Sequence, residues 1–157
     1  MTTTATVEAR MANPAALLPG VGEAIGGLIS ATRSAGLPEP LLALVHLRVS
    51  LINGCASCLH GGTQSARAAG ETDERLATVG AWREAPWYSE QERVALELAE
   101  QVTRLADAAD AVPDALWDAV VREFDEPARA ALLLWIAVVN LFNRCNAPIR
   151  QVAGTGW

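Results

Sequence analysis

The chain has 157 residues with 51% hydrophobic content, and its 18 acidic side chains outnumber its 12 basic ones, giving a formal net charge of −6. These values indicate one acidic, soluble, globular domain and argue against a nucleic-acid-binding or anionic-membrane surface. No lysine is present, which excludes Schiff-base chemistry. The longest uninterrupted apolar run, residues 130–139, is well short of the ~20 residues that cross a bilayer.

The N-terminal residues do not have the pattern expected of a secretory signal. Residues 1–12 contain Glu8 and Arg10 and lack the apolar segment of a secretory leader, so we expect a cytoplasmic protein. We expect residues 1–15 to form a flexible segment and residues 16–157 to form a single helical domain.

Helix is the predicted structure throughout the domain. Alanine and leucine are abundant, aromatic residues make up only 5%, and no stretch alternates as a strand does, so we predict an all-α fold of six or seven helices. Ser89 and Glu92 form a capping box, Pro113 is predicted at the first helical position, and Asp125 is predicted to cap the last helix. The predicted helices cover residues 21–35, 40–52, 55–69, 72–82, 89–105, 113–124 and 126 onwards.

Residues 130–139 of the last helix are apolar on every face. A helix of this kind has to be buried on all sides, either at the centre of the domain or in a subunit interface. In a domain of this size, burial in a subunit interface is favoured. We therefore expect a homo-oligomer, either a dimer, a trimer or a hexamer.

Cysteine usage gives the strongest indication of function. Two of the three cysteines, Cys55 and Cys58, form a Cys-x-x-Cys pair that opens a predicted helix, whereas Cys145 is expected to pack as an apolar side chain. This spacing places the two Cα atoms roughly 5 to 6 Å apart, which a disulfide accepts. The helix N-terminus favours the thiolate, and by this argument alone the more N-terminal Cys55 is the attacking thiol.

Other uses of the pair give different expectations. A zinc site would need four ligands, for which the candidates are Cys55, Cys58, His60 and His46. Covalent c-type haem requires a histidine directly after the second cysteine, and Leu59 occupies that position. A redox dithiol is therefore the favoured reading, and we expect neither a metal nor a cofactor.

The sequence around the cysteine pair resembles the carboxymuconolactone decarboxylase and alkylhydroperoxidase AhpD-like family. The similarity extends over most of the chain beyond about residue 15. It is carried by LLALVHLRVSLINGCASC at residues 41–58, Gly70-Glu71, Glu74-Arg75-Leu76, AWREAPW at residues 81–87, and an asparagine-rich tail with Asn140, Asn143, Arg144, Asn146 and Arg150.

The resemblance implies a function and roles for the two cysteines. Peroxidases of this family are all-helical, oligomeric and cofactor-free, and they reduce organic hydroperoxides or hydrogen peroxide. The implied function is a thiol-dependent hydroperoxide reductase, a peroxiredoxin-type antioxidant enzyme. Cys58 would be its peroxidatic thiolate and Cys55 its resolving thiol, with an external dithiol as reductant.

The family's proton relay has no counterpart at the matching positions. The family motif places a glutamate twelve residues before the first cysteine and a histidine four residues after the second, where this chain has Ala43 and Gly62. His46 lies one helical turn after Ala43 and is the candidate replacement, whereas His60 points away from Cys58. We expect Ala43→Glu with Gly62→His to raise activity without unfolding the chain.

Two alternative functions remain at this stage. Without the relay, the protein could be a non-catalytic or redox-sensing relative. A decarboxylase acting on a muconolactone-type acid would use no cysteine pair, so the pair argues against it.

The tryptophans have structural roles in this interpretation. Trp82, Trp87, Trp117 and Trp135 are expected to fill core or interface space, and Trp82 and Trp87 are also candidates for the wall of a substrate pocket.

Overall fold

The computed structural model describes residues 6–156, and all regular structure within them is helical. The all-α prediction is confirmed, and the eight α-helices of the described residues exceed the expected six or seven because the short α1 was not predicted. The α-helices are α1 Pro14–Leu17, α2 Val21–Arg33, α3 Glu39–Asn53, α4 Ala56–Ala68, α5 Asp73–Thr78, α6 Glu90–Thr103, α7 Asp114–Glu123 and α8 Glu126–Asn146. Short 3₁₀ segments cover Val79–Glu84 and Leu105–Asp107.

Local signals in the sequence set most helix ends. The Ser89–Glu92 capping box opens α6, and the Asp125 side chain accepts a hydrogen bond from the backbone N–H of Ala128 at the start of α8. Pro113 precedes α7 as its N-cap and does not occupy the first helical position, because its ψ of 154° is extended. The expected helix over residues 72–82 is divided into α5 and the first 3₁₀ segment.

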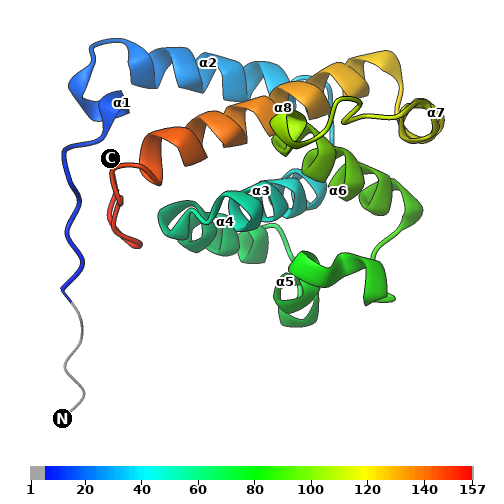
Figure 1. Ribbon diagram of the computed structural model, residues 1–157, viewed down its shortest axis with the longest axis horizontal. Helices are drawn as coiled ribbons and strands as arrows, with labels where there is room; N and C mark the ends of the chain where they lie inside the picture. The colour runs from blue at the N-terminus through cyan, green and yellow to red at the C-terminus, as the bar shows by residue number, and fades with distance from the viewer. Residues whose placement is uncertain (1–5, 157) are drawn as a thin grey trace.

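Helix α8 is the centre of the fold. It contacts α2, α3, α4, α6 and α7, and Figure 1 shows it between α2 and the α3–α4 pair. Leu132, Ile136 and Val139 of α8 are fully buried in the same core as Val45 of α3 and Leu98 of α6. The hydrophobic effect therefore fixes α3, which carries part of the site described below, against this central helix.

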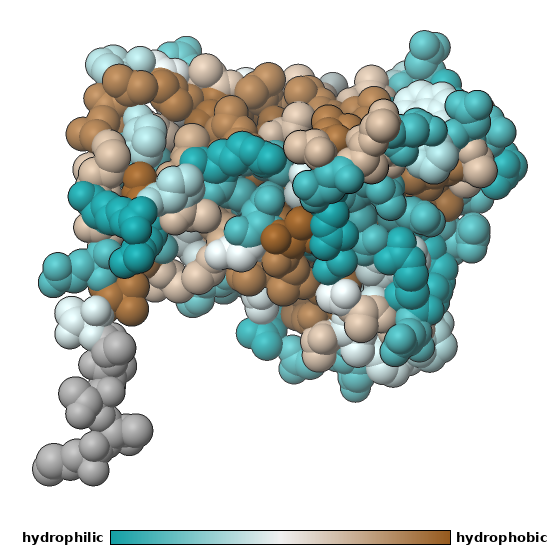
Figure 2. All heavy atoms as spheres, viewed as in Figure 1, coloured by the Kyte–Doolittle hydropathy of each residue, from teal (hydrophilic) through white to brown (hydrophobic). Residues whose placement is uncertain are grey.

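One side of α8 remains uncovered in the single chain. Ala130, Ala137 and Leu141 are exposed, so the domain by itself does not bury the apolar run on all sides. Exposed Leu17 of α1 and Leu28 of α2 add further apolar surface, and Figure 2 shows apolar atoms gathered over α1 and α2. The homo-oligomer stays a prediction.

Helix α8 is also the one helix of the described residues with the length and hydropathy to cross a membrane. It has 21 residues, and the mean hydropathy of its most apolar window is 1.3. In the fold, however, it contacts five other helices and carries the buried side chains of Asn143 and Asn146. The buried core helix of a globular protein can have the same length and hydropathy.

A buried ion-pair network holds α3 against α6. Glu100 accepts hydrogen bonds from Arg48 Nε at 2.7 Å, Trp82 Nε1 at 2.8 Å and Arg83 Nη1 at 2.7 Å. Burial alone would raise the pKa of Glu100, but these three donors lower it below its usual value. The carboxylate therefore stays charged at neutral pH.

The tryptophans divide into two groups. Trp82 and Trp135 are buried, as expected, and both indole nitrogens donate hydrogen bonds, Trp135 to the carbonyl of Leu42. Trp87 is 47% exposed and Trp117 is 38% exposed, so neither fills the core of the single chain, and their place in an interface stays a prediction.

Candidate functional site

The turn between α3 and α4 brings the cysteine pair beside α8. Helix α3 ends at Gly54, whose φ of +66° is left-handed and therefore suited to glycine. Cys55 follows as the N-cap of α4, and Cys58 lies in its first turn. The chain reverses within three residues, so α4 packs back along α3.

Cys55 and Cys58 form a disulfide in the structure. Their Cα atoms are 5.3 Å apart, so the bridge and the distance predicted from the spacing are confirmed. The pair is almost fully enclosed, with Cys55 1% and Cys58 6% exposed. Cys145, on α8, is not bridged.

Both sulfurs accept hydrogen bonds, and Cys55 Sγ has an additional contact with the Ser57 hydroxyl at 3.6 Å. Cys55 Sγ accepts from the backbone N–H of Cys58 at 3.3 Å, and Cys58 Sγ accepts from Nδ2 of buried Asn146 at 3.3 Å. The Asn146 amide is oriented by Asn13, whose Nδ2 donates to Asn146 Oδ1 at 2.7 Å. A fixed amide donor stabilises negative charge, so Asn146 favours the thiolate of Cys58.

Asn146 is the last of three asparagines spaced three residues apart on α8. Asn140 and Asn143 both accept hydrogen bonds from Asn53 Nδ2, at 3.0 and 2.8 Å. Asn143 also donates to Ser50 of α3 at 3.1 Å. Our reading of the sequence assigned no role to these asparagines, although amides repeated at helical spacing on an apolar helix are a usable signal for a polar seam.

His46 lies next to Cys58, as expected of the candidate relay residue. Its Nε2 is 3.1 Å from the carbonyl oxygen of Cys58, and a carbonyl only accepts, so Nε2 carries the proton and Nδ1 carries the lone pair. Burial lowers the pKa of His46, and the bond to the Cys58 carbonyl offsets this in part. The ring is therefore neutral at pH 7, and Nδ1 is available to accept a proton.

The absence of a side chain at Gly62 is explained by His46. A Cβ built at Gly62 would lie 2.6 Å from Cδ2 and 2.9 Å from Nε2 of the imidazole. The expectation that Gly62→His is tolerated is therefore wrong while His46 is present. The His46 ring occupies the space that the family's histidine would need.

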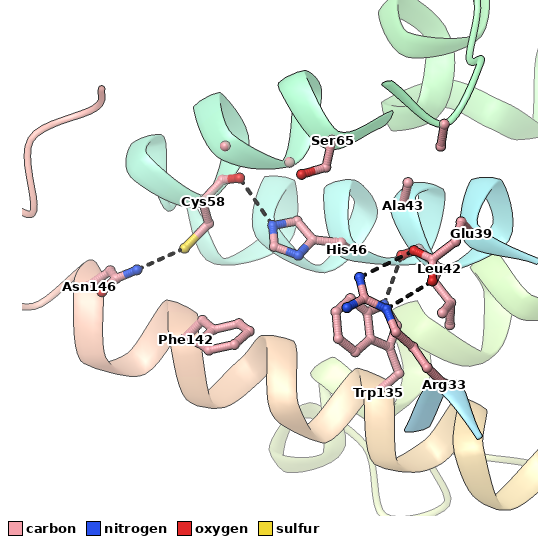
Figure 3. Close-up of a pocket in the computed structure, with 13 residues that line it drawn as sticks. Arg33, Glu39, Leu42, Ala43, His46, Cys58, Ser65, Trp135, Phe142 and Asn146 are labelled. Carbon is pink, nitrogen blue, oxygen red and sulfur yellow. Dashed lines mark hydrogen bonds and ion pairs between the residues drawn. The ribbon is translucent and has the colours of Figure 1, made fainter. Parts of the chain in front are cut away.

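A cavity of about 250 Å³ opens onto Cys58. In Figure 3, Cys58 and Asn146 lie at one end, His46 in the middle, and the Arg33–Glu39 ion pair at the other end. Apolar residues form much of the wall. They are Leu42, Ala43, Trp135 and Phe142.

Several other sequence candidates lie outside this cavity. Trp82 and Trp87 do not line it, because Trp82 is directed at Glu100 and Trp87 is exposed, so that expectation is wrong. His60 is exposed and does not line the cavity either. Within residues 6–156, no group of three or more histidine, cysteine, aspartate or glutamate side chains could hold a metal ion, which gives the zinc alternative no support.

The lowered pKa of His46 predicts a pH-dependent stability. In the unfolded chain His46 titrates near its ordinary pKa of about 6.5, whereas the folded protein takes up that proton only at lower pH. The free energy of unfolding of the oxidised protein should therefore fall as the pH drops from 7 through 6.5 toward the folded pKa. Urea unfolding at pH 7.5 and 5.5 should show a smaller loss in His46→Gln, and equal losses in both proteins would contradict the assignment.

Fold and site together define an all-helical protein with a cysteine pair at the start of a helix, beside a cavity. The profile of the carboxymuconolactone decarboxylase family matches residues 19–101, and the chain belongs to this family. The matched segment contains His46, Cys55 and Cys58. The uncharacterized protein YdfG of Bacillus subtilis (strain 168) is 37% identical over 124 residues, which are 79% of this chain and 83% of that protein.

Solved structures show the same fold. A protein of unknown function from Agrobacterium tumefaciens, for which a role in antioxidant defence as AhpD has been suggested, superposes with a TM-score of 0.85. It is 28% identical, and the match covers 95% of this chain and all of that one. The debrominase Bmp8 has a TM-score of 0.72 at 21% identity, over 87% of this chain and 73% of that one. The domain therefore has the AhpD-like helical fold.

Proposed function

We propose that this protein is a thiol-dependent hydroperoxide reductase in which Cys58 attacks the peroxide and Cys55 resolves the product. The observation that carries the proposal is the placement of Cys58 at one end of the cavity, with its sulfur bonded to the Asn146 amide and its carbonyl bonded to His46. Of the two cysteines, only Cys58 lines this cavity among the described residues, and its sulfur accepts the Asn146 hydrogen bond. This placement favours Cys58 over Cys55, the residue that the helix N-terminus alone would select.

The oxidative half-reaction needs no group beyond these side chains and the hydroperoxide. In this scheme His46 Nδ1 is the final acceptor of the proton that the Cys58 thiol loses, and Asn146 stabilises the resulting thiolate. The thiolate attacks the terminal peroxide oxygen, the O–O bond breaks, and the leaving alkoxide receives the proton from His46. Cys58 is then a sulfenic acid, and the alcohol is the product.

The second step closes the disulfide seen in the structure. The Cys55 sulfur attacks the Cys58 sulfur, and hydroxide leaves, taking up the proton that Cys55 loses, so that water is released. The short distance between the cysteines allows closure with little backbone movement. Two electrons from an external dithiol then restore the pair.

The walls of the cavity favour an organic hydroperoxide over hydrogen peroxide. Leu42, Trp135 and Phe142 offer apolar and aromatic contacts to an alkyl or aryl group, and binding of such a group releases water from these surfaces. Hydrogen peroxide has no apolar part that could use this wall.

Consumption of an organic hydroperoxide with dithiothreitol as reductant tests the proposal. We expect catalytic turnover by the unmodified protein, a higher kcat/KM for cumene hydroperoxide than for hydrogen peroxide, and no turnover by Cys58→Ser. Cys145→Ser is the matched control and should keep full activity, because Cys145 is outside the disulfide. A disulfide that forms once, without turnover, would instead indicate a redox sensor.

A further inference from the structure

A second cavity lies on the other side of the disulfide. It has a volume of about 380 Å³ and is formed by the start of α4 and the C-terminal segment after α8. Among the described residues, Cys55 lines this cavity and Cys58 does not, whereas Cys58 lines the first cavity and Cys55 does not. Asn146 contributes to both walls and separates the two spaces.

We propose that this second cavity binds a low-molecular-mass thiol, which reduces the disulfide by attacking Cys55. The proposal rests on the proposed function, because it assigns to that reaction a separate entry for its reductant. Oxidant would then reach Cys58 through one cavity and reductant would reach Cys55 through the other. Neither reagent would have to leave before the other arrives.

The enclosure of Cys55 defines the class of reductant. Its residue is 1% exposed, so a folded dithiol protein cannot bring its own sulfur into contact without displacing the surrounding chain. A slender thiol fits a cavity of this volume, which Val7, Val152 and Ala153 line beside Cys55. Arg150 also lines it, and its positive charge favours the approach of a thiolate, the attacking form.

Attack at Cys55 releases Cys58, which already has a hydrogen-bond donor in place. A reductant thiolate bonds to Cys55 Sγ, the Cys55–Cys58 bond breaks, and the electron pair leaves on Cys58 as a thiolate that accepts the Asn146 hydrogen bond. A second thiol then attacks the mixed disulfide, releasing the reductant as its own disulfide and Cys55 as a thiol. Two thiols are oxidised for each protein disulfide that is reduced.

Trapping of the mixed disulfide tests the site of attack in the unmodified protein. The disulfide is formed with diamide, and 2-mercaptoethanol is added together with iodoacetamide, which alkylates the cysteine that is released. Fragment spectra of the peptide containing both cysteines should show mercaptoethanol on Cys55 and the alkyl group on Cys58. The reverse pattern would overturn the proposal.

A pair of matched substitutions tests the two routes of entry. Ala153→Phe fills the second cavity and should slow reduction by dithiothreitol by roughly tenfold or more, because disulfide exchange depends on access, while oxidation by cumene hydroperoxide is unchanged. Ala69→Phe, in the wall of the first cavity, should have the opposite effects. Reduction of Ala153→Phe at the wild-type rate would overturn the proposal.

The two proposals fail in different ways in these experiments. Diamide forms the disulfide without any hydroperoxide, so the reductive half-reaction can be measured whether or not the protein is a peroxidase. If hydroperoxide does not oxidise the reduced protein, the proposed function fails. If mercaptoethanol is attached to Cys58, the assignment of the second cavity fails.

Discussion

Replacement of His46 by alanine is expected to lower the rate of hydroperoxide reduction by roughly 10²- to 10⁴-fold, the usual contribution of general acid–base catalysis. His46 is the histidine that adjoins Cys58, and its neutral ring presents Nδ1 as a proton acceptor. Stopped-flow oxidation of the reduced protein measures this step alone. The loss should be smaller at high pH, where the Cys58 thiol ionises without a base.

The control transfers the relay to the positions that the family uses. Ala43→Glu with Gly62→His should restore part of the activity in the His46→Ala background, where the two closest imidazole atoms are gone and Leu47 Cδ2, at 3.2 Å, is the next neighbour of a Cβ at Gly62. The same two substitutions should damage the protein that retains His46, because the new Cβ would lie 2.6 Å from the imidazole. His46→Ala with the wild-type rate would show that His46 is not the relay.

Glu100→Gln is expected to destabilise the protein by about 3 to 5 kcal/mol, because it leaves Arg48 without its buried partner. The Arg48 side chain is only 13% exposed, so water cannot replace the carboxylate. Urea unfolding at pH 7 measures the decrease in the free energy of unfolding. A decrease is expected because the lowered pKa of Glu100 keeps its carboxylate charged at this pH, so the substitution removes a charged partner.

Glu97→Gln is the matched control for Glu100. Glu97 also pairs with Arg83, but at 3.8 Å and with both side chains about half exposed, so its loss should cost about 1 kcal/mol or less. Equal effects of the two substitutions would contradict the view that burial of the Arg48–Glu100 pair, and not charge alone, fixes α3 against α6.

Local signals in the sequence were sufficient to predict the helices and the cysteine pair. The capping box at Ser89, the break between the helices predicted over residues 40–52 and 55–69, and the Cys-x-x-Cys spacing each depend on a few neighbouring residues, and the structure has all three. The sequence also allowed His46 to be named as a candidate, because its separation of one helical turn from Ala43 depends on α3 alone.

The remaining parts of the site depend on contacts between distant segments. The Asn146–Cys58 bond joins residues 88 positions apart, and Asn13 reaches Asn146 across 133 positions. The conflict between His46 and a side chain at Gly62 arises only because α4 packs closely on α3. Periodicity and spacing describe one helix at a time, so they could not predict any of these three contacts.

The role of Cys58 can be measured directly in a variant that cannot close the disulfide. Reduced Cys55→Ser is treated with one equivalent of cumene hydroperoxide in the presence of dimedone, which labels sulfenic acids, and the labelled residue is located by mass spectrometry. We predict that dimedone is attached to Cys58. An unlabelled Cys58, with the label on Cys145 or on no residue, would contradict the assignment of Cys58 as the peroxidatic cysteine.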